Sequence, residues 1–159
     1  MNLPAFKFPK PLGIALSMLP TYPPSLLFSH GLNLALGRII KPELLQPLHG
    51  KLVSIHVTDA GMRLFFTINS TGFVACKSGK APDLAISATA YDFLLLGTRR
   101  EDPDTLFFSR RLVIEGETEL GLLAKNTLDS VEMPRLNLSR FTPDKVLEKV
   151  ASRLLAVSR

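Results

Sequence analysis

The sequence is poor in the residues that build covalent or metal-held frameworks. Cysteine occurs once among 159 residues, at Cys76, and tryptophan does not occur. A single thiol excludes a disulfide within the chain and a zinc site made of several cysteines. The composition, 46% hydrophobic and 21% charged, is typical of one globular domain. A chain that forms no internal disulfide is consistent with a reducing compartment.

Motifs for catalysis and cofactor binding are also missing. The three histidines form no HExxH pair, and no GxSxG nucleophile motif occurs. Gly79-Lys80 is followed by Ala81, where a phosphate-binding loop needs a hydroxyl residue. The sequence therefore predicts no cofactor, no metal ion and no enzymatic activity, and it favours a binding protein.

No segment has the continuous apolar length of a membrane-spanning helix. The best candidate, residues 11–37, contains no charged residue but is broken by three prolines, and a spanning helix needs about 20 mostly apolar residues. A signal peptide is a poor match too, because no small-x-small cleavage site follows the apolar stretch. From these two observations we expect a cytoplasmic protein.

Charge is distributed unevenly along the chain. Residues 1–50 hold four basic side chains against one acidic (+3), residues 51–134 nine against eleven (−2), and residues 135–159 six against two (+4). Both basic ends are also apolar, which favours contact with a membrane surface over nucleic acid. The alternative is that these ends pack on the domain and that their charge only aids solubility.

The first half of the chain changes from helical to strand patterning. Six prolines within residues 1–24 prevent one long helix, although residues 12–19 can form two turns. Residues 25–40 are predicted to form a helix and 43–46 a short helical turn. The apolar stripe of the predicted helix consists of Leu26, Leu27, Leu34, Ile39 and Ile40.

Five segments have the patterns of strands. Residues 51–58, KLVSIHVT, alternate between apolar and polar side chains, and tight turns separate the segments that follow, which predicts antiparallel hairpins. Helices are predicted at 91–99, capped by Thr89, and at 118–131, with a helical turn at 106–108. The other four strands are predicted at 62–69, 73–77, 84–88 and 111–115.

The C-terminal segment is predicted to be a linker and an amphipathic helix. Thr142-Pro143-Asp144 is a typical helix start, because it combines a capping hydroxyl, a proline and an acidic residue. Lys145, Lys149 and Arg153 recur every four residues beside the apolar stripe, where they can reach lipid phosphates. The alternative is that this helix docks on the domain.

The middle of the chain carries a family resemblance. After a strand comes ATAYDFLLLGTRREDPDTLFFSRR, then the strand LVIEG, then the helix ETELGLLAKNTLD. This order, with its aspartate-proline turn, FF patch and Glu-Gly strand end, resembles the sterol carrier protein type 2 family. The segment DPDTLFFSRRLVIEGETELGL is most similar to one bacterial branch of this family, the accessory lipid carriers of oxygen-independent ubiquinone biosynthesis.

The resemblance implies a fold, a ligand and a setting. The expected fold is α+β, a five-stranded antiparallel sheet packed by helices around an apolar lipid-binding tunnel. It divides the chain into an N-terminal arm and helix (1–49), the lipid-binding domain (50–132), and the linker with its basic helix (133–159). The branch implies a polyprenylated quinone precursor as the ligand, ubiquinone-biosynthesis proteins as partners, and a peripheral position at the membrane.

Candidate lipid-lining residues are the large apolar side chains of the predicted strands and helices, although each of them can equally be ordinary core. These residues are Phe65, Phe73, Ile86, Phe93, Leu94, Phe107, Phe108, Leu112, Ile114, Leu120 and Leu123.

Two arginine pairs flank the FF patch. Arginine suits a phosphate headgroup because its planar guanidinium donates two parallel hydrogen bonds. We therefore predict that one of these pairs meets an anionic headgroup or the bilayer surface; the alternative is a solvated face paired with Glu101, Asp102 and Asp104. The four residues are Arg99, Arg100, Arg110 and Arg111.

The sequence thus favours a non-enzymatic lipid carrier that assists ubiquinone biosynthesis. Two alternatives remain open. One is a protein that binds anionic phospholipid, such as phosphatidic acid, for membrane homeostasis. The other is a scaffold that binds biosynthetic enzymes and no lipid.

Overall fold

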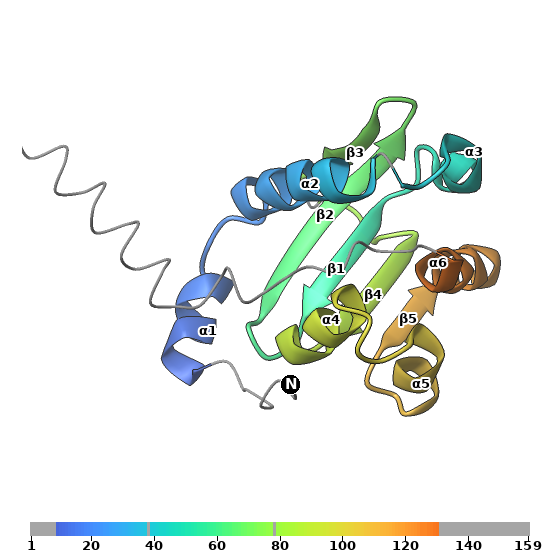
Figure 1. The fold of residues 1–159 in the computed structure, drawn as a ribbon. Helices are drawn as coiled ribbons and strands as arrows, with labels where there is room; N and C mark the ends of the chain where they lie inside the picture. Colours follow the sequence, from blue (N-terminus) through green and yellow to red (C-terminus); the bar gives the residue numbers. More distant parts are fainter. Residues whose placement is uncertain (1–8, 38, 78, 131–159) are drawn as a thin grey trace, which may run out of the picture.

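The computed structural model describes residues 9–37, 39–77 and 79–130. Within them helices and strands form an α+β fold, as predicted (Figure 1). The predicted C-terminal helix, with Lys145, Lys149 and Arg153, falls outside the described residues. None of the described helices is long and apolar enough to cross a bilayer. The elements are α1 (Lys10–Ser17), α2 (Tyr22–Leu36), α3 (Pro42–Leu45), a 3-10 turn (Gln46–Leu48), β1 (Val53–Val57), β2 (Met62–Asn69), β3 (Gly72–Ala75), β4 (Leu84–Ala88), α4 (Ala90–Gly97), α5 (Pro103–Phe108), β5 (Val113–Gly116) and α6 (Thr118–Ser130).

The five strands form one sheet in the order β3-β2-β1-β4-β5. The predicted hairpins β1–β2 and β2–β3 are confirmed, and β4 and β5 are antiparallel as well. One strand pair differs from the expected antiparallel sheet, because β1 and β4 run parallel, with Val53 opposite Leu84.

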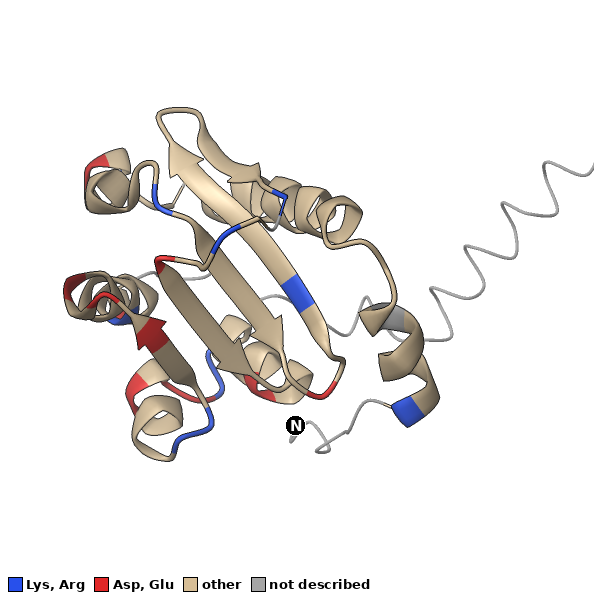
Figure 2. Cartoon of the chain, turned by 180° about the vertical axis from the view of Figure 1, so that it is seen from behind, with Lys and Arg blue, Asp and Glu red and all other residues tan. Residues whose placement is uncertain are grey.

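A stagger between the strands explains the parallel pair. Phe66 of β2 lies opposite both Val53 of β1 and Ala75 of β3, so β3 ends at the level where β1 begins. Leu84, the first residue of β4, lies at this same level. The connection 76–83 therefore only has to pass sideways over β2 and β1, which it does on the side facing away from the helices (Figure 2).

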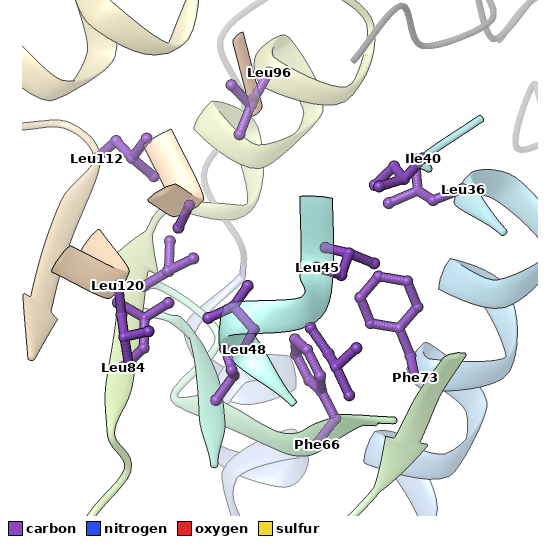
Figure 3. Close-up of a cluster of buried hydrophobic side chains, with 14 of the residues drawn as sticks. Leu36, Ile40, Leu45, Leu48, Phe66, Phe73, Leu84, Leu96, Leu112 and Leu120 are labelled. Atoms are coloured by element: carbon purple, nitrogen blue, oxygen red, sulfur yellow. The ribbon is translucent and has the colours of Figure 1, made fainter. Parts of the chain in front are cut away.

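The core lies between the sheet and its helices. Side chains alternate along a strand, so the face that contains Val53 and Phe66 also contains Ile68, Leu84 and Ile86. Helices α2, α4, α5 and α6 lie on this side of the sheet (Figure 1). Figure 3 shows the resulting cluster of buried leucine, isoleucine and phenylalanine side chains.

Helix α2 presents a mixed face to the sheet, where two serines are buried beside the apolar side chains Phe28, Leu32 and Leu36. Ser25 and Ser29 are fully buried, whereas Leu26, Leu27 and Leu34 are exposed. Most of the apolar stripe predicted for this helix thus faces outward, a correction to its expected role. The cause is the open edge of the sheet beside α2, where short polar side chains allow close approach and bind backbone groups.

Candidate functional site

The segment on which the resemblance depends is held together by polar caps. Thr89 caps α4, as predicted, because its hydroxyl accepts a hydrogen bond from the Asp92 amide at 3.1 Å. Asp102 caps α5 in the same way by accepting from the Thr105 amide at 2.8 Å. The side-chain and backbone hydrogen bonds of Thr105 hold the pKa of Asp102 below its ordinary value. The aspartate-proline turn therefore begins a helix.

Ion pairs join α4 to the chain that precedes and follows α5, and join α5 to α6. The Arg111 guanidinium donates from Nε to Asp92 Oδ1 and from Nη1 to both Glu101 oxygens, each at 2.9 Å. Burial opposes its charge, but Asp92 and then Glu101 outweigh this effect and raise the pKa of Arg111. Lys125 of α6 pairs with Asp104 of α5 at 2.6 Å. These charged residues of the segment thus bind one another.

The other arginines follow the ends of α4 and α5. Arg99 and Arg110 have left-handed backbones, with φ of 53° and 58°, at the positions where the two helices end. Arg99 donates from Nη2 to the Asp129 carbonyl at 3.2 Å, whereas Arg110 is exposed. Glu101, Asp102 and Asp104 were the possible partners of these arginines in the alternative prediction. Glu101 does bind Arg111, whereas Asp102 caps α5 and Asp104 binds Lys125. A headgroup role for the arginines stays a prediction.

The candidate lining residues fall into three environments. Phe73, Ile86, Leu112 and Leu120 belong to the buried core, and Phe93, Ile114 and Leu123 are partly buried against it, while Leu94 is half-buried. Phe65 is buried, but it is in register with Ser54 on the opposite face of the sheet from Phe66. Phe107 and Phe108 pack edge to face and are exposed, Phe108 by 78%.

A pocket of about 290 Å³ lies at one end of this core, and Phe73 is the candidate residue that lines it. It is bounded by the end of α2, the chain from Gly37 to Leu45, and the turn between β2 and β3. In Figure 3 the apolar side chains Leu36, Ile40, Leu45 and Phe73 gather on this side of the cluster. Their positions make the floor of the pocket apolar.

The pocket combines this apolar floor with an uncharged polar rim. The rim carries Asn69, Ser70, Thr71 and His49, and no acidic or basic side chain (histidine apart) is among the described residues that line the pocket. The Asn69 carboxamide accepts hydrogen bonds from the Thr71 amide and hydroxyl, which fixes the turn at the mouth. Such a pocket suits a ligand with a neutral polar group on an apolar body.

Sequence reasoning missed most of the pocket. Leu36, Ile40 and Leu45 come from the segment 1–49 that was separated from the lipid-binding domain, yet they are buried in its core. A usable signal was present in α2, where Ser25, Ser29 and Asn33 recur every four residues. That period marks a polar helix face, which has to find hydrogen-bond partners when it is buried.

Two comparisons with known sequences show which proteins this chain is similar to. The model of the SCP-2 sterol transfer family matches residues 32–129. The ubiquinone biosynthesis accessory factor UbiT of Escherichia coli strain K12 is 45% identical over 92 residues, and that of Escherichia coli O157:H7 matches equally. The match covers 58% of this chain and 52% of either relative, so it spans about half their length.

A solved structure supports the same fold. The UbiJ-SCP2 ubiquinone synthesis protein superposes with a TM-score of 0.53 at 18% identity, over 66% of this chain and 92% of the other. At this identity the likeness concerns the fold alone. The two proteins thus share an overall fold.

Proposed function

Because this chain belongs to the SCP-2 sterol transfer family, we propose that it is a non-enzymatic lipid carrier that holds a polyprenylated quinone intermediate of oxygen-independent ubiquinone biosynthesis. The proposal is supported by the relatives that are named ubiquinone biosynthesis accessory factors. In this role the protein works in the cytoplasm at the membrane surface, where it presents the intermediate to biosynthetic enzymes.

The single observation that carries the choice of ligand is that none of the described residues lining the pocket, histidine apart, is acidic or basic. A quinone precursor consists of a polar but neutral ring and an apolar tail, which matches a neutral rim above Leu36, Ile40 and Leu45. The volume of about 290 Å³ lies near the lower limit of small-molecule pockets, about 300–1,000 Å³. It therefore suits the ring and the first part of the tail.

Anionic phospholipid is the second candidate ligand. Lys41 is exposed and stands between the pocket residues Ile40 and Pro42, so a cation is available beside the mouth. A phosphate bound there would gain a charge-assisted hydrogen bond. The neutral rim itself favours the quinone precursor.

Lipid extraction and native mass spectrometry of the full chain, purified from anaerobically grown bacteria, test the proposal. We expect prenylated quinone precursors in the bound fraction; phospholipid instead would select the second candidate. A protein that is always empty but still captures biosynthetic enzymes would indicate a scaffold.

Two variants link the loading to the pocket. Leu45→Phe fills the floor and Ser70→Trp covers the rim, and each should lower the bound lipid about tenfold by removing apolar area that the ligand buries. Leu122→Phe, on the exposed side of α6, is the matched control and should load normally. Unchanged loading in both folded pocket variants would place the lipid elsewhere.

A further inference from the structure

Helices α5 and α6 expose large apolar side chains on the outside of the domain. Phe107 and Phe108, at the end of α5, pack edge to face with their ring centres 5.7 Å apart, and both are exposed. Leu122 of α6 is exposed by 58%. Grouped apolar side chains that remain in contact with water mark an interaction site. We call these three side chains the aromatic patch.

One ion pair joins the parts of α5 and α6 that carry the patch. Lys125 of α6 contacts Asp104 of α5 at 2.6 Å. Phe107 and Phe108 lie three and four residues after Asp104, and Leu122 lies three residues before Lys125. Residues three or four apart share one face of a helix. The helix faces that the ion pair joins are therefore the faces that carry the patch.

The surroundings of the aromatic patch are acidic. Residues 101–119 hold six acidic side chains against two basic ones, a net charge of −4. Figure 2 shows acidic segments on α5, β5 and α6. Glu115 and Glu119 are exposed, and neither forms an ion pair with another of the described residues. Their carboxylates are thus available to a cation from outside this part of the chain.

The C-terminal segment of this chain has the complementary composition. Residues 135–159, which fall outside the described residues, hold six basic side chains against two acidic ones. The helix predicted after Pro143 has Lys145, Lys149 and Arg153 beside an apolar stripe. A basic helix with an apolar stripe matches an acidic surface with exposed apolar side chains. The stripe consists of Val146, Leu147, Val150, Leu154 and Leu155.

The C-terminal segment is also long enough to reach the aromatic patch. Helix α6 ends at Ser130, and its length is about 20 Å at 1.5 Å per residue. Residues 131–141 can extend over about 36 Å, at roughly 3.3 Å per residue. This connection can therefore span the whole of α6, which itself lies against α5 (Figure 1). A helix that starts after residue 141 can thus fold back along α6 onto the patch.

We propose that residues 142–155 form a helix that docks on the aromatic patch of the same chain. Its apolar stripe covers the exposed side chains of α5 and α6, and its lysines lie beside Glu115 and Glu119. Of the two roles predicted for this helix, the charge and the reach favour docking on the domain over contact with a membrane. The docking is independent of the ligand in the pocket.

Hydrogen exchange of the full chain, read by mass spectrometry on peptides from residues 142–155, tests the docking. A helix of this length is marginal in water by itself, so protected amides require a surface that holds it. We expect protection in the unmodified chain and a decrease of about tenfold or more in Phe107→Ser/Phe108→Ser, which removes the apolar contact. Leu27→Ser, at an exposed position of α2, is the control and should keep the protection. Exchange in β1 and β2 reports whether each variant is folded.

Charge reversal tests the acidic part of the surface. Glu115→Lys/Glu119→Lys should lower the protection of residues 142–155 about threefold or more, because surface ion pairs are individually weak. Adding Lys145→Glu/Lys149→Glu to the same chain should restore the protection, since the charges are again opposite.

Three results would overturn the proposal: unprotected amides in the unmodified chain, protection that the phenylalanine substitutions leave unchanged, or no recovery in the fourfold charge variant. Protection that is lost on dilution would assign the helix to the patch of a second copy. Protection that appears only after anionic vesicles are added would assign it to a membrane. Both of these outcomes reject docking within one chain.

Discussion

The side-chain amide of Asn33 in α2 pairs with the backbone of Phe73 in the edge strand β3. Nδ2 donates to the Phe73 carbonyl and Oδ1 accepts from the Phe73 amide, both at 2.8 Å. The carboxamide thus takes the place of one residue of a neighbouring strand. It also closes this part of the sheet edge to pairing with another chain.

Asn33→Ala should destabilise the protein by about 2 kcal/mol, because each lost hydrogen bond contributes about 1 kcal/mol. Denaturant unfolding measures the change, and the amide of Phe73 should lose protection against hydrogen exchange. Asn33→Asp keeps the acceptor, but it places a carboxylate oxygen, which cannot donate, against the Phe73 carbonyl, so the loss of unfolding free energy should be similar or larger. Unaltered exchange at Phe73 in Asn33→Ala would contradict the bridging role.

Ser25 and Ser29 allow a matched comparison within α2. Both are fully buried, but the Ser25 hydroxyl accepts from the Phe65 amide at 2.9 Å, while the Ser29 hydroxyl has no partner among the described residues. Ser25→Ala should lower the free energy of unfolding by about 1–3 kcal/mol, because it leaves a buried amide unpaired. Ser29→Ala should be neutral or stabilising, because it removes an unpaired hydroxyl.

Thermal and denaturant unfolding of the two variants test this difference. The substitutions remove the same atom from the same helix, so differences in helix propensity cancel. Equal effects of Ser25→Ala and Ser29→Ala would contradict the assignment of the Phe65 contact.

The strands were predictable because their information is local. In KLVSIHVT every second side chain is apolar, and a turn follows directly, so both the strand and its hairpin can be derived from neighbouring residues. The parallel pairing of β1 with β4 was not predictable in this way. It depends on how far β2 extends beyond β1, which is a property of the assembled sheet.

The candidate site was less accessible to sequence reasoning. Three leucines of α2 (26, 27 and 34) were predicted to be buried but are exposed, because the open sheet edge beside β2 and β3 hydrogen-bonds Ser25 and Asn33 instead. The pocket then formed from residues far apart in the chain, such as Leu36 and Thr71. Hydrophobic periodicity alone does not show which of two helix faces a sheet edge will bind.

Arg111 should matter more for stability than Lys125 does. Arg111→Gln leaves the buried carboxylate of Asp92 without its cation, and we expect a loss of about 2 kcal/mol, moderated because the arginine side chain is 37% exposed. Lys125→Gln breaks a pair whose acid is about half exposed, and it should cost at most about 1 kcal/mol. Urea denaturation compares the two, and a larger loss for Lys125→Gln would contradict this order.

Arg110 allows a separate test of headgroup binding. It is exposed, so Arg110→Gln should leave the stability unchanged. If this residue contacts an anionic headgroup, the variant should carry less phospholipid at the same total protein. Lipid extraction from Arg110→Gln and from the unmodified chain measures the difference, and equal phospholipid content would remove Arg110 from the headgroup site.

His56 should make the protein less stable as the pH falls below about 6.5. Burial, and then the charge of Arg63 opposite it on β2, lower the pKa of His56 from its ordinary 6.5. The unfolded chain therefore binds a proton more readily than the folded chain does. The contribution of His56 to the free energy of unfolding is complete above pH 6.5. It decreases as the pH falls and stops changing below the pKa of His56 in the folded state.

NMR titration of the His56 ring measures this pKa directly. In Arg63→Gln the pKa should rise but remain below 6.5, because burial is the larger cause and persists in the variant. Lys51→Gln removes a positive charge just before the opposite end of β1 and should leave the titration of His56 nearly unchanged. His56→Gln should flatten the fall in unfolding free energy between pH 7 and pH 5. A ring that titrates at or above 6.5 in the folded protein would reject the explanation, since neither burial nor Arg63 would then disfavour its charged form.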